Sequence, residues 1–421
     1  MNGASEFGIR NSESPACVLM VAGGTGGHIF PALAVAEELR ARGERSGARY
    51  EIEFLGTQRP LEAKLIPAAG FRLRAVQAAG LKGIGGIQWL RNLLVLPRTA
   101  IAVADILREF RPHVVVGVGG YLAGPVMIEA ALAGIPTILI EPNARPGLTN
   151  RLLAPMVRAA AVGFAETAHL YGGKAHVTGH PVRRAFFEIP PRRPVAQALE
   201  SVGQVIKPVQ AQPNAAEATV AQALLPVQTQ PGVAVSLKTQ PGGAATPFTV
   251  FIVGGSQGSR AINRAVPESL ALLANAPIRI IHQTGEHDYN EVRRAYQERG
   301  LIVEVQAFID DMPGALAQAD LVISRAGATA VAELAAAGRA ALLIPFPGAT
   351  DQHQLENARA MEKAGAARVL VQSELTPERL AGEIRGLMAS AETLDKMAAN
   401  ARRLAKPDAA ARIADLVEGF V

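Results

Sequence analysis

The chain has 421 residues, of which 49% are apolar and 19% charged, a length that suggests two domains or three and a composition that excludes full disorder. A single cysteine excludes an internal disulfide and a cysteine-based zinc site, and no uninterrupted apolar run is long enough for a membrane-spanning helix. The net charge of +5 favours anionic partners, but the lack of long basic blocks and aromatic clusters argues against nucleic acid.

Short apolar runs recur along the chain, and each ends in glycine or a polar loop and precedes an alanine-rich helical stretch. Continuous apolar strands alternating with helices indicate parallel sheets covered on both faces. We therefore predict an α/β protein with two Rossmann-like domains, over 16–181 and 182–403. The main predicted strands lie in 17–24, 114–120, 136–143, 248–255, 278–285, 320–327 and 340–347.

Three segments fall outside this regular pattern. Residues 189–247 are rich in proline, glutamine and alanine and contain no aromatic residue and no Asp, so we expect a disordered insertion in the second domain, with a helix at 214–225 left open. The first 15 residues lack the apolar stretch of a signal peptide, which favours a cytoplasmic protein. The apolar pattern at the end of the chain predicts an amphipathic helix, and we expect residues 404–421 to pack against the first domain.

The first glycine-rich loop, Gly23–His28, follows a predicted strand, and we expect the next helix to begin near Pro31. Glycine amides and a helix N-terminus together suit a phosphate or diphosphate. The spacing is not G-x-G-x-x-G, and the next predicted strand ends in Gly-Thr-Gln-Arg at 56–59, without the carboxylate that a nicotinamide site needs. His28 either serves as a base or phosphate ligand or caps the helix start, and both readings stay open.

The second half of the chain repeats this device. The loop 254–259 again follows a strand directly, and two such loops in comparable places favour a ligand in the cleft between the domains. The loop 324–330 leads into a helix whose amides can hold a diphosphate, with Glu333 placed for the hydroxyls of a ribose. The alternative for Glu333 is a solvated helix carboxylate. The polar run 351–357 suits sugar hydroxyls.

Two other features carry weaker signals. Asp310 and Asp311 are neighbours rather than a D-x-D pair, so we expect one of them to cap a helix and we expect no required metal. The segment 81–98 combines apolar residues and Trp89 with basic residues, which is typical either of a helix lying on a membrane surface with anionic lipids or of a buried helix with a basic rim.

Taken together, nine motifs resemble the MurG family in order from about residue 17 to 405. Members of this family transfer GlcNAc from UDP-GlcNAc to lipid I and so make lipid II for peptidoglycan. The resemblance implies a GT-B fold, in which two Rossmann-like domains face a central cleft, and it implies no cofactor. The motifs are GGTGGH (23–28), GGYLAGP (119–125), EPNARPGLTN (141–150), GHPVR (179–183), GGSQG (254–258), HQTG (282–285), FIDDM (308–312), AGATAVAELAAAG (326–338) and DQHQLENA (351–358).

The resemblance also implies roles for individual residues. Thr25, Gly26 and Gly27 match a loop at the reaction centre that holds the acceptor diphosphate, and His28 is the leading base candidate, with Glu141 second. Helix N-termini would stabilise the departing UDP. The expected donor contacts are Asn143, Arg183, Ser256 and the 328–332 turn (Ala328, Thr329, Ala330, Val331 and Ala332), with Ile309 at the uracil, Glu333 at the ribose and Gln354 at GlcNAc.

The chain departs from the family pattern at three positions in two motifs. Ile140 and Pro142 stand where the family usually has His and Gln of His-Glu-Gln-Asn, and His180 replaces a usual asparagine. The expected location is the cytoplasmic face of the bacterial plasma membrane, as a peripheral protein, with 81–98 docking on anionic lipids and with contacts to other cell-wall and division proteins. Three rivals stay open: a related transferase with an acceptor such as diacylglycerol, a nucleotide-sugar epimerase, and a non-catalytic nucleotide-sugar-binding scaffold.

Overall fold

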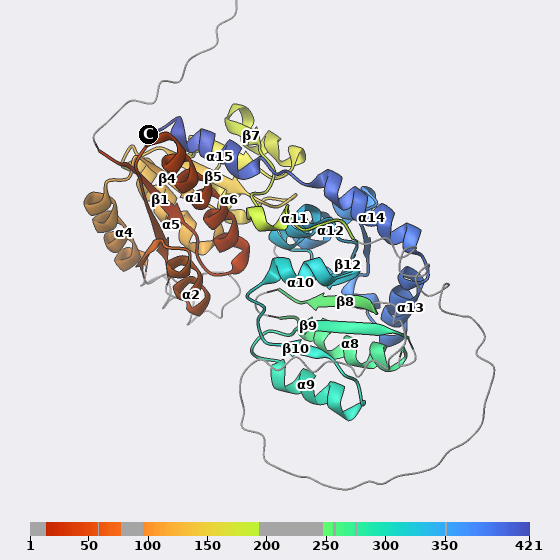
Figure 1. The fold of residues 1–421 in the computed structure, drawn as a ribbon. Helices are drawn as coiled ribbons and strands as arrows, with labels where there is room; N and C mark the ends of the chain where they lie inside the picture. The colour runs from red at the N-terminus through yellow and green to blue at the C-terminus, as the bar shows by residue number, and fades with distance from the viewer. Residues whose placement is uncertain are drawn as a thin grey trace, which may run out of the picture.

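The computed structural model describes residues 14–57, 59–76, 96–192, 247–255, 258–273, 276–349 and 352–421. Most of the predicted insertion 189–247 and of the predicted membrane segment 81–98 lies outside these residues. The described chain forms two parallel sheets with helices on both faces, which confirms the predicted α/β class (Figure 1).

The first domain is built on a seven-stranded parallel sheet with the order β3-β2-β1-β4-β5-β6-β7. Its strands are β1 (Ala16–Val21), β2 (Tyr50–Gly56), β3 (Arg72–Ala75), β4 (Val114–Gly117), β5 (Thr137–Glu141), β6 (Ala159–Val162) and β7 (Ala175–Val177). Its helices are α1 (Gly26–Ser46), α2 (Pro60–Ala68), α4 (Leu96–Phe110), α5 (Gly120–Leu132) and α6 (Leu148–Leu153).

The second domain repeats this plan with a six-stranded parallel sheet in the order β10-β9-β8-β11-β12-β13. Its strands are β8 (Phe248–Val253), β9 (Ile278–Gln283), β10 (Glu304–Gln306), β11 (Leu321–Ser324), β12 (Ala341–Leu343) and β13 (Ala367–Val369). The helices that follow are α8 (Arg260–Ala271), α9 (Tyr289–Glu298), α10 (Met312–Gln318), α11 (Ala328–Ala337), α12 (His353–Lys363), α13 (Pro377–Met388), α14 (Ala391–Leu404) and α15 (Ala409–Glu418).

Successive side chains of β1 enter two different layers of core. Val18 and Met20 pack on the side of α1 and α15, whereas Leu19 and Val21 pack on the side of α4 and α5. All four side chains are fully buried. A strand covered on both faces needs apolar side chains at every position, which explains the continuous apolar runs of the sequence.

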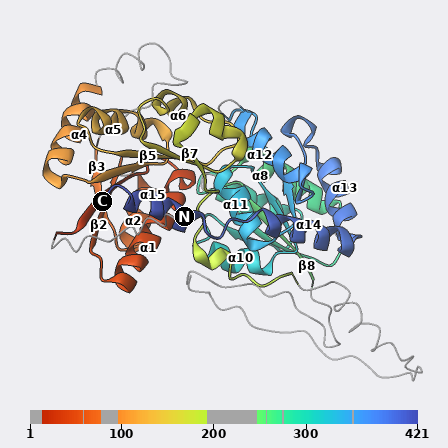
Figure 2. The ribbon, with the colours of Figure 1, turned by 90° about the horizontal axis from the view of Figure 1, so that it is seen from above.

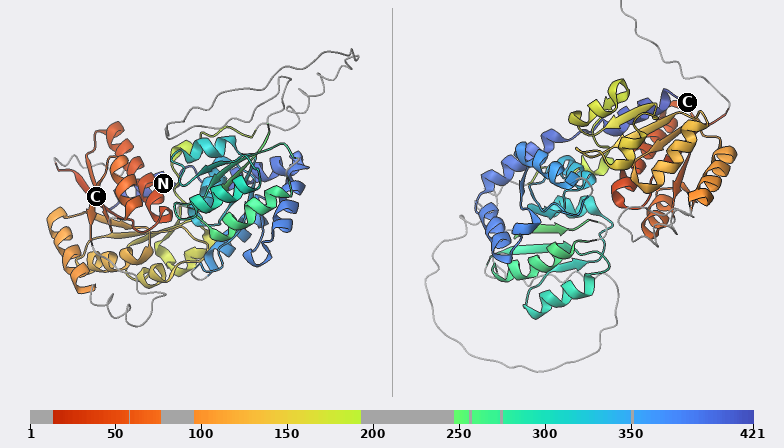
Figure 3. Two further views of the ribbon diagram at one scale, coloured as in Figure 1. Left: turned by 90° about the horizontal axis from the view of Figure 1, so that it is seen from below. Right: turned by 180° about the vertical axis from the view of Figure 1, so that it is seen from behind.

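The C-terminal helices join the two domains. Helix α14 packs against α11 of the second domain, and α15 then crosses to pack against α1 of the first (Figures 1 and 3). Arg42 of α1 donates to Asp415 at 2.7 Å and to Glu418 at 2.6 Å, and Tyr50 donates to Glu418 at 2.7 Å. Buried Ile413 adds apolar contact to this seam. None of the helices in the described parts of the chain combines the length and apolar character needed to cross a membrane.

Helix α1 begins five residues before the predicted start near Pro31. Its first residue is Gly26, and Thr25 precedes it in an extended conformation. Glycine and proline both argue against helix in a sequence, but proline removes only one backbone bond, from its own missing N–H to the Gly27 carbonyl. The hydroxyl of Thr329 in the second domain donates to that carbonyl at 3.2 Å, so the oxygen keeps a partner.

Candidate active site

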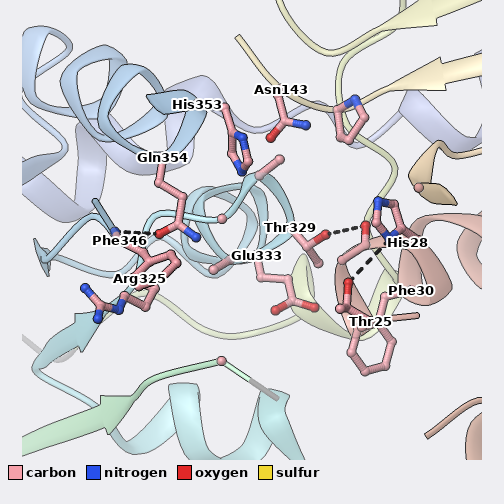
Figure 4. A pocket seen from close by; sticks show the side chains of 18 of the residues that line it. Thr25, His28, Phe30, Asn143, Arg325, Thr329, Glu333, Phe346, His353 and Gln354 are labelled. Carbon is pink, nitrogen blue, oxygen red and sulfur yellow. Dashed lines mark hydrogen bonds between the residues drawn. The ribbon is translucent and has the colours of Figure 1, made fainter. Parts of the chain in front are cut away.

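Figure 2 shows the two domains side by side, and a cleft of about 1310 Å³ lies between them at the carboxyl ends of both sheets. The loops after β1, β4 and β5 line it on one side, and the loops after β8, β11 and β12 line it on the other. Ligands of open parallel sheets bind at this edge, because the loops and helix N-termini that follow the strands converge there. The cleft is therefore the candidate active site (Figure 4).

The first-domain wall is the start of α1. Thr25, Gly26, Gly27 and His28, all expected at the reaction centre, line the cleft. The first backbone bond of the helix runs from the His28 amide to the Thr25 carbonyl at 3.0 Å, and no described residue accepts from the amides of Gly26 and Gly27. These two N–H groups and the positive end of the helix dipole suit an anion.

His28 is placed to act as a base. Its Nδ1 lies 3.3 Å from the hydroxyl oxygen of Thr25, and its ring borders the cleft (Figure 4). Burial lowers the pKa of His28 and the facing His353 lowers it further, while a backbone hydrogen bond to Gly23 works against this shift. The neutral ring therefore dominates at neutral pH, and a neutral imidazole has one nitrogen free to take a proton.

Glu141, the second base candidate, does not line the cleft. Its carboxylate is fully buried and accepts from the Asn143 amide at 2.9 Å and from the Asn150 side chain at 2.7 Å. Burial raises the pKa of Glu141 to about 7, although these donors oppose the shift. Asn143 itself lines the cleft, so Glu141 lies behind the cleft wall and orients this asparagine through hydrogen bonds from its backbone and side-chain N–H groups.

Of the three departures from the family pattern, Pro142 lines the cleft, whereas Ile140 and His180 lie in the interior. Ile140 of β5 is 1% exposed and belongs to the core of the first domain. His180 is 8% exposed and does not line the cleft, and burial lowers its pKa to about 3, which keeps the ring neutral. Neither of these two buried positions contributes a side chain to the cleft.

The second-domain wall is the start of α11. Ala328, Thr329 and Ala330 line the cleft, and their amides precede the first backbone bond of the helix, from Val331 to the Gly327 carbonyl at 3.0 Å. Gly327 has no side chain to cap these amides. Of the expected diphosphate turn, Val331 and Ala332 do not line the cleft, and Val331 packs in the core.

Glu333 lies one turn into α11 and faces the cleft (Figure 4). Its side chain is 15% exposed, and burial raises its pKa to about 7 against the opposing charge of Arg183, whose Nη2 lies 3.8 Å away. Arg183 also stacks on the ring of Phe30 from α1, at 4.5 Å from the centroid. The sequence analysis missed Phe30, which links this pair to the first domain.

Two further donor candidates have partners that restrict what they can bind. The Gln354 side-chain oxygen accepts from the Phe346 amide at 3.0 Å, so its NH₂ group is left to donate to a sugar oxygen. The Ile309 amide donates to the Gln283 side chain at 3.0 Å, which leaves its carbonyl for a base N–H. Both residues line the cleft, whereas Ser256 lies outside the described residues.

Polar bonds cross between the domains at the cleft. Asn357 of α12 is fully buried, accepts from the Ala144 amide at 3.1 Å and donates to the Asn143 side chain at 3.4 Å. Sequence reasoning missed this role, because the two asparagines are 214 positions apart and no local pattern links them. The Asn143 side chain is thus held from both domains.

The charge balance of the cleft favours an anion. Asp310 and Glu333 are the only carboxylates among its described lining residues, against Arg183, Arg260 and Arg325. Burial lowers the pKa of Arg325 to about 10, which leaves it charged at neutral pH. No group of three or more His, Cys, Asp or Glu side chains gathers at a metal-binding distance within the described parts of the chain. Asp311 caps α10 by accepting from the Gly314 amide, as one of the two neighbouring aspartates was predicted to do.

Comparison with known proteins agrees with this architecture. The model of the glycosyltransferase family 28 N-terminal domain matches residues 18–162, and that of the family 28 C-terminal domain matches 249–413. A UDP-N-acetylglucosamine–N-acetylmuramyl-(pentapeptide) pyrophosphoryl-undecaprenol N-acetylglucosamine transferase of Solibacter usitatus is 39% identical over 406 residues, which cover 96% of each chain. The transferase of the same name from Alkalilimnicola ehrlichii is 41% identical over 94% of this chain and 97% of its own.

Among solved structures, the chain is similar to the crystal structure of MurG from Acinetobacter baumannii. The TM-score is 0.67 and the sequence identity 30%, and the match covers 96% of this chain and all of the other. Sequence and structure thus lead to the same group of relatives over nearly the whole chain.

Proposed function

The chain belongs to the MurG family of glycosyltransferases, and we propose that it transfers GlcNAc from UDP-GlcNAc to the C4 hydroxyl of the MurNAc unit of lipid I, giving lipid II. The observation that carries this proposal is the meeting of two helix N-termini in the cleft. Gly27 of α1 and Thr329 of α11 touch there, with His28 on one side and Glu333 on the other (Figure 4). Two anion-binding helix ends suit a reaction between two diphosphate substrates.

The second domain, residues 182–403, holds the donor in this proposal. The free amides at the start of α11 bind the UDP diphosphate, and Glu333 accepts from the ribose hydroxyls. Ile309 meets the uracil, and Gln354 donates to GlcNAc. Arg183 and Asn143 complete the donor site, since both line the cleft near these groups.

The first domain, residues 16–181 with the returning helix 404–421, holds the acceptor. The amides of Gly26 and Gly27 bind the lipid I diphosphate at the positive end of α1. Neutral His28 takes the proton of the C4 hydroxyl as the hydroxyl oxygen attacks the anomeric carbon. The bond from that carbon to the UDP oxygen breaks, UDP leaves with the electron pair, and the configuration inverts. The α11 amides and Arg325 stabilise the charge that develops on UDP.

We place the protein at the cytoplasmic face of the plasma membrane, bound to anionic lipids as a peripheral protein. Helices α4, α5 and α6 lie along one side of the first domain (Figure 2), and exposed apolar side chains on these helices support this location. They are Ile101 at 64% exposed, Leu132 at 78%, Leu148 at 48% and Leu152 at 67%.

The test is transfer of radiolabelled GlcNAc from UDP-GlcNAc to a soluble lipid I analogue, compared with diacylglycerol and with no acceptor. Label in the lipid I analogue alone is the expected result. Label in diacylglycerol would indicate the related lipid transferase, and conversion of the free nucleotide sugar to its C2 epimer would indicate an epimerase. Donor binding without any product would overturn the proposal in favour of a scaffold.

A further inference from the structure

A buried carboxylate lies directly behind the first glycine-rich loop. Glu62 projects from the first turn of α2 and is fully buried. One of its oxygens accepts from the Gly24 amide at 2.6 Å and the other from the Thr57 amide at 2.5 Å. The Thr57 hydroxyl donates to the same carboxylate at 3.0 Å. Glu62 therefore ties the loop after β1 to the end of β2.

The surrounding backbone is shaped to hold this carboxylate. A Cβ atom on Gly56 would lie 2.7 Å from one Glu62 oxygen, and a Cβ atom on Gly23 would lie 3.4 Å from the other. Gly24 has φ of +99°, a conformation that side chains disfavour. Gly56 thus leaves room for the buried carboxylate, Gly24 supplies a backbone conformation that presents its amide, and the N–H and hydroxyl donors satisfy the charge.

This arrangement differs from that of a dinucleotide-binding domain. There the loop amides bind a pyrophosphate, and a carboxylate at the end of the second strand binds the ribose. Here β2 ends at Gly56 and Thr57 follows it, and the carboxylate comes from α2 and binds the loop itself. The Gly24 amide already donates to the Glu62 carboxylate. A bound phosphate or diphosphate would therefore find the amides of Gly26 and Gly27, at the start of α1, without an acceptor.

We propose that Glu62 is a positioning residue for the transfer reaction: it fixes Gly24 so that the start of α1 and the His28 side chain project into the cleft. His28 follows the held residue by only four positions, and its ring hydrogen-bonds the backbone at Gly23, which adjoins the held residue. The predicted effect on turnover rests on the proposed function. The predicted effect on the position of His28 does not.

The variant that tests the role is Glu62→Gln, which keeps the shape of the side chain but turns an accepting oxygen into a donor NH₂ facing an N–H group. The matched control is Glu53→Gln, because Glu53 is also a buried first-domain carboxylate, 3% exposed and paired with Arg72 and Arg74, away from the loop. We expect Glu62→Gln to lower kcat/KM for the lipid I analogue at least tenfold and to leave the Kd of UDP-GlcNAc unchanged. Glu53→Gln changes neither quantity.

A second readout is independent of turnover. The His28 ring titrates in an NMR experiment, assigned with His28→Asn, and loosening of the loop by Glu62→Gln raises the His28 pKa toward that of an exposed histidine. Should Glu62→Gln not fold, Thr57→Val removes one donor to the same carboxylate and gives smaller changes in the same direction. An unchanged His28 titration together with wild-type kinetics overturns the positioning role. A shifted titration in a protein whose wild type transfers no sugar overturns the proposed function and leaves the positioning role standing.

Discussion

The two glycine-rich loops of this molecule, 23–28 and 254–259, have a similar backbone conformation but different hydrogen-bond partners. Each follows a strand that is third from one edge of its sheet, β1 or β8, and each has a glycine with positive φ at the same step, Gly24 at +99° and Gly255 at +91°. The first loop is held by the Glu62 carboxylate. The described residues of the second loop bond only to neutral groups, among them the Gln283 side chain, which donates to the Gly255 carbonyl at 3.1 Å.

This difference suggests different roles for the two loops. In the first loop, the Glu62 carboxylate occupies the Gly24 amide and repels a phosphate there, so we expect this loop to act as a fixed support for His28. The described residues of the second loop bind no such carboxylate, and they line the cleft together with the α11 amides that bind the UDP diphosphate in the proposed function. In the proposed function, the same strand-loop-helix unit thus belongs to the base-bearing side of the cleft in one domain and to the donor side in the other.

The largest expected effect comes from removing the base on the first wall. His28→Ala lowers kcat by roughly 10²- to 10⁴-fold, the usual contribution of a general base, and leaves the Kd of UDP-GlcNAc unchanged because the donor lies on the other wall. Kinetics with the lipid I analogue and calorimetry with UDP-GlcNAc measure the two quantities. His169→Ala, at an exposed position of the same domain, is the control. Wild-type turnover in His28→Ala would remove this residue from the mechanism.

A change on the second-domain side of the cleft should affect donor binding first. Glu333→Ala weakens binding of UDP-GlcNAc by about 1.5–3 kcal/mol, because hydrogen bonds from the ribose hydroxyls to a charged acceptor are lost. Glu383→Ala serves as the control, since its side chain is similarly buried, at 17% exposed, in the same domain but outside the cleft. Calorimetry that gives both variants the wild-type Kd would contradict the ribose contact.

The raised pKa of Glu333 makes donor binding depend on pH, which tests the role of the second-domain side of the cleft. Since burial raises this pKa to about 7, the carboxyl is largely protonated at pH 6, with only Arg183 opposing the shift. A donor that binds the ionised form must displace that proton, so its Kd falls about tenfold per pH unit on the way up to pH 7 and levels off above it. Glu333→Gln cannot ionise and gives a flat profile in the same titration. A wild-type profile as flat as that of the variant would show that the bound form is protonated.

The features predicted from the sequence are those set by neighbouring residues. The strands, the glycine-rich turns and the aspartate cap of α10 follow from apolar runs, from glycine and from the short reach of Asp311 to Gly314. The start of α1 was predicted wrongly because what satisfies the Gly27 carbonyl comes from the other domain. Local rules for proline could not show that partner.

Roles that depend on how elements pack were not accessible from the sequence. Glu62 sits on a helix whose sequence gives no sign that its first turn points back to the loop after β1, 38 residues away. Asn357 belongs to the polar run that we predicted to bind sugar hydroxyls. Its hydrogen bond to Asn143 depends on the packing of α12 against the first domain. Glu141 matched a family motif, yet its burial behind Asn143 depends on Asn150, which reaches it from α6.

The smallest expected effect concerns the bond that joins the two walls. Thr329→Val keeps the size of the side chain and removes the hydroxyl that donates to the Gly27 carbonyl, which Pro31 leaves without a helical partner. Loss of one such bond costs about 0.5–1.5 kcal/mol, or roughly a 2- to 12-fold drop in kcat/KM, because the donor and acceptor walls lose their fixed separation. Thr329→Ser keeps the hydroxyl and restores the rate. If serine and valine impair transfer equally, the loss is not specific to the hydroxyl, and the cross-domain bond does not explain it. If neither variant impairs it, the two walls keep their spacing through Asn357 and α15 alone.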